Sequence, residues 1–250
     1  MTSSQPLMDV KPIAPGLWRW TAPHPEWTPE KDRPDGWPRM VGSVYFEPAP
    51  APPGGATGAV VLVDPLAPPS GSPEAATFWS ALDRDIERAR LPVAIIVANG
   101  YHLRGALEFD RRYAGKYGAA TYAHADAVAR LGFQPTHLID AAATLLPGVE
   151  VHPVEGLDAG ETALFIRPHR ALVFADAVMG AGGGRLAVAP PSWAAEGEAA
   201  GRRYRERFRA SLRRLLELEP AIVLPSHGEP VLAGGRDALS AALAAPAWGE

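Results

Sequence analysis

Two short apolar stretches of the chain each lead to a residue that can bind a metal ion or a proton. Residues 172–175 are apolar and run into Asp176, and residues 221–224 are apolar and end three positions before His227. Both patterns predict a buried strand that ends at a loop. Because a carboxylate that leaves water needs compensation, Asp176 requires a backbone N–H, a base or a metal ion as its partner. An aspartate that only caps the following turn is the simpler alternative.

The composition restricts the chemistry that such residues can perform. The chain has 250 residues, a net charge of −4, seven histidines and no cysteine. Disulfides, thiolate catalysis and cysteine metal ligands are therefore excluded. The negative charge argues against a nucleic-acid partner. No apolar run reaches the ~20 residues of a membrane span, and the first residues do not resemble a signal peptide, so we expect a cytoplasmic protein without a membrane partner.

The periodicity of apolar residues predicts alternating strands and helices, which indicates an α/β protein. We expect a single domain over residues 1–250, with residues 1–15 as a loosely ordered lead-in. Strands are predicted at 16–21, 40–47, 59–65, 92–97, 121–124, 144–146, 149–154, 162–167, 170–174 and 222–224. Helices are predicted at 74–89, 106–113, 125–131, 198–217 and 235–243.

A long irregular loop at residues 22–38 contains His24, Trp27 and Trp37. A loop of this length inside a compact domain is often functional. The two tryptophans either line a binding site, where they would suit a flat apolar ligand, or pin the loop to the core.

The order of five segments resembles the metallo-β-lactamase fold family. These segments are VVLVDP at 60–65, IIVANGYH at 95–102, VEVHPVEGLDAGETALFI at 149–166, ALVFADAVMG at 171–180 and VLPSHGEPV at 223–231. The resemblance covers most of the chain and implies a four-layered αββα sandwich, with metal ions held at strand ends between the two sheets. It places Asp176 at the family's metal-bridging aspartate and His227 at its last metal-binding histidine.

The segment that corresponds to the family's H-x-H-x-D-H signature is degenerate. Aligned from the preceding strand, Asn99 takes the place of the first histidine and every ligand is lost. Aligned from the following helix, His102 takes the place of the last histidine, Tyr101 stands where an aspartate is expected, and the loop is two residues shorter. Leu157 stands at the family's next histidine and has no donor atom, so the resemblance implies that no two-metal centre forms.

Two states of the remaining site are compatible with these residues. In the first, His102, Asp176 and His227 are both metal ligands and catalytic residues and hold one Zn²⁺ or Fe²⁺. In the second, no metal binds. Arg104 then swings in to neutralise Asp176, or Asp176 and His227 form a hydrogen-bonded pair.

Three functions follow as hypotheses. In the first, the chain is a hydrolase-like enzyme that uses one metal ion on an ester, a lactone or a related small molecule. In the second, it is a pseudo-enzyme that binds a ligand or a protein without turnover. The third is metal-free acid–base chemistry by Tyr101, His102 or His227. A small-molecule ligand is expected, and a homodimer is compatible with the sequence. The expected substrate-binding residues are Trp27, Trp37, Tyr101 and Arg104.

Overall fold

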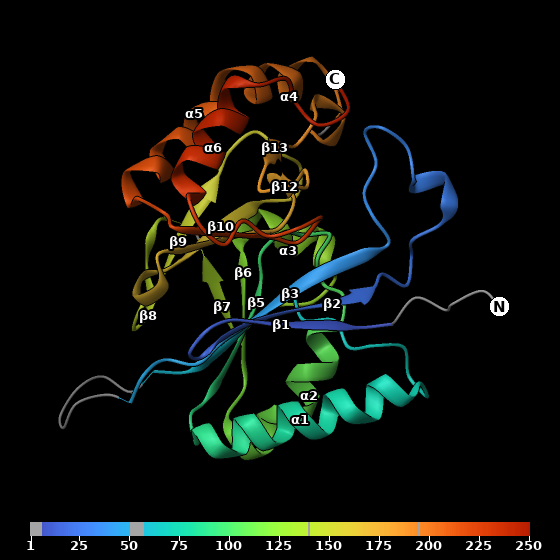
Figure 1. Cartoon of the computed structure of the whole chain (residues 1–250), viewed down its shortest axis with the longest axis vertical. Coiled ribbons are helices and arrows are strands. Elements are labelled where there is room, and N and C mark those ends of the chain that lie inside the picture. The colour runs from blue at the N-terminus through green and yellow to red at the C-terminus, as the bar shows by residue number, and fades with distance from the viewer. Residues whose placement is uncertain (1–6, 51–57, 140, 195) are drawn as a thin grey trace.

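The chain folds into two stacked β-sheets with helices on both outer faces (Figure 1). The computed structural model describes residues 7–50, 58–139, 141–194 and 196–250. The larger sheet has the strand order β1-β2-β3-β4-β5-β6-β7, and the smaller sheet has the order β14-β11-β10-β9-β8. Strands β12 and β13 form a separate two-stranded sheet. The architecture is the αββα sandwich that the sequence predicted.

The strands of the larger sheet are β1 (Asp9–Ala14), β2 (Leu17–Pro23), β3 (Met40–Phe46), β4 (Val60–Val63), β5 (Val93–Val97), β6 (Ala120–His124) and β7 (His137–Ile139). The other strands are β8 (Ala143–Leu146), β9 (Val149–Val154), β10 (Glu161–Ile166), β11 (Ala171–Phe174), β12 (Val178–Gly180), β13 (Leu186–Val188) and β14 (Ile222–Pro225). The α-helices are α1 (Pro73–Ala89), α2 (Ala106–Tyr117), α3 (Val128–Leu131), α4 (Glu198–Arg203), α5 (Arg209–Arg214) and α6 (Gly235–Ala244).

Parallel pairing in both sheets brings the site residues to one edge of the sandwich. Strand β4 pairs with β5 in parallel, and β11 pairs with β14 in parallel. The carboxyl ends of parallel neighbours lie at the same edge of a sheet. The loops that follow these four strands therefore meet, and they carry Asp64, His102, Asp176 and His227.

Three apolar layers hold the sandwich together. Between the sheets, Val61 and Ile96 of the larger sheet share a buried cluster with Val173 of the smaller sheet. Helices α1 and α2 cover the outer face of the larger sheet, and α5 and α6 cover that of the smaller sheet (Figure 1). Phe109 and Phe208 are each fully buried under these helices. Burial of one such side chain contributes about 1.5–3 kcal/mol.

Strand β1 is the largest departure from the sequence prediction, which assigned residues 1–15 to a loosely ordered lead-in. Residues 9–14 instead pair antiparallel with β2 along the edge of the larger sheet. Most side chains of β1 are exposed, so the pairing depends on backbone hydrogen bonds that leave no apolar pattern in the sequence. Residues 1–6 of the predicted lead-in lie outside the described residues.

The predicted helix at 198–217 is confirmed as a helical stretch, but it is not uniform. A π-helical turn, Tyr204–Phe208, separates α4 from α5, and a 3₁₀ turn, Leu215–Leu218, follows. Tyr204 and Phe208 are both buried against the smaller sheet. Among the described helices, none is long and apolar enough to cross a membrane.

Candidate metal site and cavity

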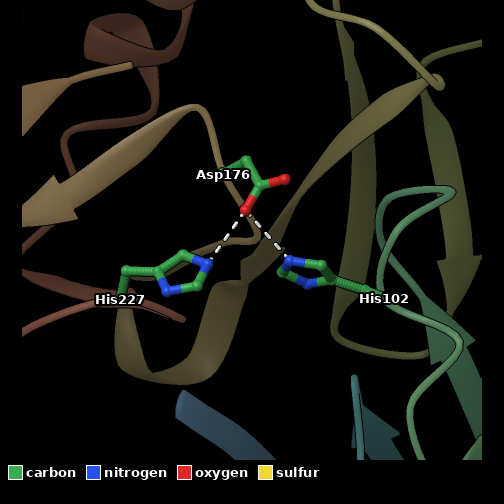
Figure 2. A group of neighbouring side chains, drawn as sticks. All are labelled: His102, Asp176 and His227. Atoms are coloured by element: carbon green, nitrogen blue, oxygen red, sulfur yellow. Dashed lines mark hydrogen bonds and ion pairs between the residues drawn. The ribbon is translucent and has the colours of Figure 1, made fainter. Parts of the chain in front are cut away.

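Asp176 lies between two imidazoles at the edge of the sandwich (Figure 2). Its Oδ1 lies 3.0 Å from Nε2 of His102 and 3.0 Å from Nε2 of His227. The three residues thus come from the ends of β11, β14 and the loop after β5, which confirms the predicted convergence of Asp176 and His227. One ligand atom from each residue lies within 4.8 Å of the others.

Asp64 fixes the ring of His102 from the other side. Its Oδ2 lies 2.7 Å from His102 Nδ1, and its Oδ1 accepts the Ala98 N–H at 2.8 Å. Asp64 has a positive φ of 46°, a region in which aspartate is enriched. The contact places a carboxylate behind a candidate metal-binding imidazole, an arrangement that sets the tautomer and orientation of metal ligands.

The two histidines differ in basicity. Burial and the nearby Arg104 oppose the protonation of His102, but the carboxylates of Asp176 and Asp64 outweigh them and raise its pKa to about 9. Burial lowers the pKa of His227, although Asp176 acts in the opposite direction. Burial also disfavours the charged form of Asp176, yet its contacts with His102 and His227 hold its pKa well below the usual range.

Glu161, at the start of β10, supports the backbone of Asp176. Its carboxylate accepts the N–H groups of Ala175, Asp176 and Ala177 at 3.0–3.2 Å. Asn99 Nδ2 also donates to Glu161 Oε2 at 3.1 Å. Burial, followed by the charge of Asp176, raises the pKa of Glu161 to about 7. The sequence analysis missed Glu161; a carboxylate beginning an otherwise apolar strand was the available signal.

Arg104 does not form an ion pair with Asp176, which was one of the two metal-free alternatives; the other, a hydrogen-bonded pair of Asp176 and His227, is present at 3.0 Å. Its Nη1 donates to the Gly42 carbonyl at 3.0 Å, and its Nη2 lies 3.3 Å from His102 Nε2. Among the ion pairs of the described residues, Asp176 pairs with His102 and His227. The backbone of Arg104 has a φ of 41°, and its side chain contacts β3 on the way to the site. The direct compensation of Asp176 therefore comes from imidazoles and not from guanidinium.

The loop that carries His227 is held mainly through its backbone. The Gly180 N–H donates to the His227 carbonyl at 2.8 Å. Arg19, which is buried, donates through Nη2 to the carbonyls of Pro225 at 3.1 Å and Gly228 at 2.8 Å. These two carbonyls flank His227 in the sequence, so Arg19 fastens β2 to both sides of the histidine.

A cavity of about 1010 Å³ opens above the three candidate ligands. The loop after β2 contributes His24 and Trp37 to its wall, and the 3₁₀ turn Pro191–Trp193 contributes Trp193. The ring centroids of Trp37 and Trp193 lie 5.5 and 6.0 Å from that of His227. His24 and Trp193 had no predicted role in the site, because nothing in the local sequence connects them with residue 227.

Three of the four predicted substrate-binding residues line this cavity: Trp37, Tyr101 and Arg104. Trp27 lies elsewhere and donates its indole N–H to the Trp37 carbonyl at 3.0 Å. This bond joins two residues of the same loop, whereas the alternative for Trp27 was a contact that pins the loop to the core. The Tyr101 hydroxyl donates to Asp158 at 2.6 Å, so that side chain already has a partner at the cavity rim.

The donor set fits one transition-metal ion. Ligand bonds of about 2.0–2.2 Å put the donors of a tetrahedral site ~3.4 Å apart, close to the contacts that His102 and His227 make with Asp176. Two imidazoles and one carboxylate are suitable ligands for Zn²⁺ or Fe²⁺. Leu157 lines the same cavity and has no donor atom.

Solved metallo-β-lactamases share the fold over almost the whole chain. A metallo-β-lactamase from Hirschia baltica aligns over 95% of this chain and 96% of its own, with 15% identity and a TM-score of 0.60. FIM-1 from Pseudomonas aeruginosa, in its mono-zinc form, aligns over 95% of both chains, with 14% identity and a TM-score of 0.57. A β-lactamase domain protein from Burkholderia ambifaria aligns over 94% of this chain and 72% of its own, with 16% identity and a TM-score of 0.63.

No family model and no curated protein matches the sequence. The structural matches nevertheless define the class: the chain has the metallo-β-lactamase fold, as the order of its sequence segments predicted. Sequence identities of 13–16% make it a divergent example of that fold. The His102, Asp176 and His227 cluster could hold a metal ion.

Proposed function

We propose that this chain is a hydrolase-like protein that uses a single metal ion, Zn²⁺ or Fe²⁺, on a small molecule. The observation that supports this proposal is the convergence of His102 Nε2, Asp176 Oδ1 and His227 Nε2 within 4.8 Å at the floor of a cavity. We further propose that residues 1–250 act as one domain in the cytoplasm, without a nucleic-acid partner.

His102, Asp176 and His227 would hold the ion. Such an ion supplies polarisation of a substrate carbonyl and activation of water at neutral pH. Asp64 keeps Nε2 of His102 directed at Asp176 by holding Nδ1 at 2.7 Å. Glu161 keeps Asp176 in place through three consecutive backbone N–H groups. Trp37 and Trp193 line the cavity and supply apolar surface next to His227.

Metal content and zinc affinity of purified protein test the proposal. We expect one equivalent of metal in the wild type and a loss of at least about tenfold in zinc affinity in Asp176→Asn, because the amide is a poor ligand. Asp237→Asn is the matched control, since the Asp237 side chain is 90% exposed in the first turn of α6. Two equivalents of metal, or equal zinc affinities for wild type and Asp176→Asn, would contradict the proposal.

The alternative is a pseudo-enzyme that binds a ligand or a protein without metal. The guanidinium of Arg104 favours it, because Nη2 lies 3.3 Å from the His102 nitrogen that would bind the ion. In that case the purified protein contains no stoichiometric metal, and a chelator leaves the melting temperature of the wild type unchanged.

A further inference from the structure

The Arg104 guanidinium has fewer acceptors than donors. Arginine carries five N–H groups. Arg104 makes one hydrogen bond to the Gly42 carbonyl through Nη1, and Nη2 approaches His102 Nε2. Its Nε is buried and has no acceptor among the described residues. The side chain lines the cavity, so its remaining Nη hydrogens are available to a molecule that enters.

The two carboxylates near Arg104, those of Asp64 and Asp176, already contact other groups. Asp64 contacts His102 and the Ala98 N–H. Asp176 contacts both His102 and His227. Neither carboxylate lies within ion-pair distance of Arg104 among the described contacts. The positive charge of Arg104 is therefore compensated by these carboxylates only at longer range.

Metal binding would leave Arg104 with still less compensation. An ion on His102 Nε2 would replace the proton of that nitrogen, which lies 3.3 Å from Arg104 Nη2, with a larger positive charge. The same ion offsets the negative charge of Asp176, which at present attracts the guanidinium. A cation beside a metal ion favours an anionic ligand, by the Coulomb attraction of both positive charges.

The walls next to Arg104 suit an apolar body. The indole rings of Trp37 and Trp193 approach His227 from above the site, and Leu157 lines the same cavity. The cavity is also lined by acidic side chains, namely Glu26, Glu30, Asp35, Asp158 and Glu196, which outnumber the basic side chains Lys31, Arg33 and Arg130. These acids disfavour a highly charged ligand such as a phosphate dianion, and a planar monoanion matches the guanidinium fork.

We propose that the cavity binds a small molecule that carries a carboxylate on an apolar or aromatic body. Arg104 binds the carboxylate, and Trp37 and Trp193 flank the body. The proposal rests on the proposed function in one respect: it assigns a ligand to the same cavity. Recognition by Arg104 itself does not require the ion, but a bound ion strengthens it.

Calorimetric titration with benzoate and with benzamide, its neutral analogue, tests the proposal. We expect the wild type to prefer benzoate to benzamide and Arg104→Gln to lose at least about tenfold in benzoate affinity, which is ~1.4 kcal/mol. Arg104→Lys should retain part of the affinity, since it keeps the positive charge but loses the two parallel N–H donors of the guanidinium. Arg213→Gln is the control, because Arg213 is exposed on α5.

Several outcomes would overturn the proposal: no benzoate binding by the wild type, equal affinity of the wild type for benzoate and benzamide, or equal benzoate affinity in Arg104→Gln and wild type. The wild-type comparison decides the question even if Arg104→Gln fails to fold. Loss of benzoate binding in Arg130→Gln with full binding in Arg104→Gln would also overturn it, since Arg130 lines the same cavity but pairs with Asp158 at 2.6 Å.

The titrations are performed on zinc-loaded protein and on protein stripped of metal and dialysed. Zinc should tighten benzoate binding, and benzoate should tighten zinc binding by the same factor. If zinc does not bind but benzoate binding still depends on Arg104, the metal-dependent function is wrong and the carboxylate site stands. If zinc binds and benzoate binding ignores Arg104, the carboxylate site is wrong and the metal-dependent function stands.

Discussion

His102 and His227 face the same oxygen of Asp176 but are held in place by different means. The imidazole of His102 is fixed at both nitrogens, by Asp64 at 2.7 Å and by Asp176 at 3.0 Å. The imidazole of His227 contacts Asp176 through Nε2, and its Nδ1 is buried without a partner among the described residues. Its position depends on the backbone contacts made by Gly180 and Arg19.

The two histidines also differ in their protonation state. Two carboxylates make His102 a strong base, whereas burial keeps His227 neutral at ordinary pH. In the metal-free protein, His102 therefore carries the positive charge that Asp176 requires. Binding of a metal ion must displace a proton from His102, whereas neutral His227 only has to move its proton from Nε2, which contacts the Asp176 carboxylate, to Nδ1.

The largest effect on stability is expected when the Asp64 carboxylate is removed. Asp64→Asn keeps an acceptor for the Ala98 N–H and tolerates the positive φ, but it removes one counter-charge from His102. We expect metal-free protein to lose about 3 kcal/mol of unfolding free energy, near the lower end for a broken buried pair because Asp176 remains. Urea denaturation measures this loss, with exposed Asp237→Asn as the control.

Zinc affinity provides a second measurement on the same variant. Removal of a carboxylate behind a histidine ligand typically costs about 10–100-fold in metal affinity. Unchanged stability and unchanged zinc affinity in Asp64→Asn would show that the contact with Asp64 does not hold His102.

The pH dependence of stability should reveal the charge on His102. Its pKa is raised from 6.5 to about 9 on folding, so the folded protein binds the proton more tightly. The resulting stabilisation is fully present below pH 6.5 and is lost as the pH rises through about 9. A shift of this size corresponds to about 3 kcal/mol.

Urea denaturation of metal-free protein between pH 8 and pH 9 measures how the unfolding free energy changes with pH, because this interval lies above the pKa of about 7 of Glu161. In Asp64→Asn, the unfolding free energy should change less with pH over this interval. Wild-type stability that stays constant over this interval would mean that His102 is not the charged member of the pair.

The smallest effect on stability and zinc affinity is expected for the clamp around His227, by which we mean the hydrogen bonds from Arg19 to the carbonyls of Pro225 and Gly228. Arg19→Met preserves much of the side-chain volume but leaves the carbonyls of Pro225 and Gly228 without this donor. We expect a loss of about 1–3 kcal/mol in unfolding free energy and a smaller loss of zinc affinity than in Asp64→Asn. Arg213→Met on the exposed face of α5 is the control.

Gly42→Ala checks the same clamp from the opposite strand, because a Cβ at this position would lie 2.6 Å from Nη2 of Arg19. It should resemble Arg19→Met in its effect on zinc affinity. If either variant weakens zinc binding more than Asp64→Asn does, the contrast between the two histidines is wrong.

The sequence by itself determined the fold and two of the candidate ligands. Buried strands such as β5, β11 and β14 are short apolar runs with a polar residue within two positions of their ends, and this pattern is local. Asp176 and His227 follow such runs, and the resemblance to the metallo-β-lactamase family placed both at one metal site, so their convergence could be predicted. Strand β1 could not, because its pairing uses backbone groups and leaves its side chains exposed.

Only the tertiary structure decided which partner each site residue has. Asp64 and His102 are 38 positions apart, and Glu161 and Asp176 are 15 apart; which atoms meet depends on how the two sheets stack. Arg104 has a backbone φ of 41°, and its guanidinium contacts the Gly42 carbonyl and not Asp176. A conformation of this kind is set by the surrounding packing, because residue type alone disfavours it.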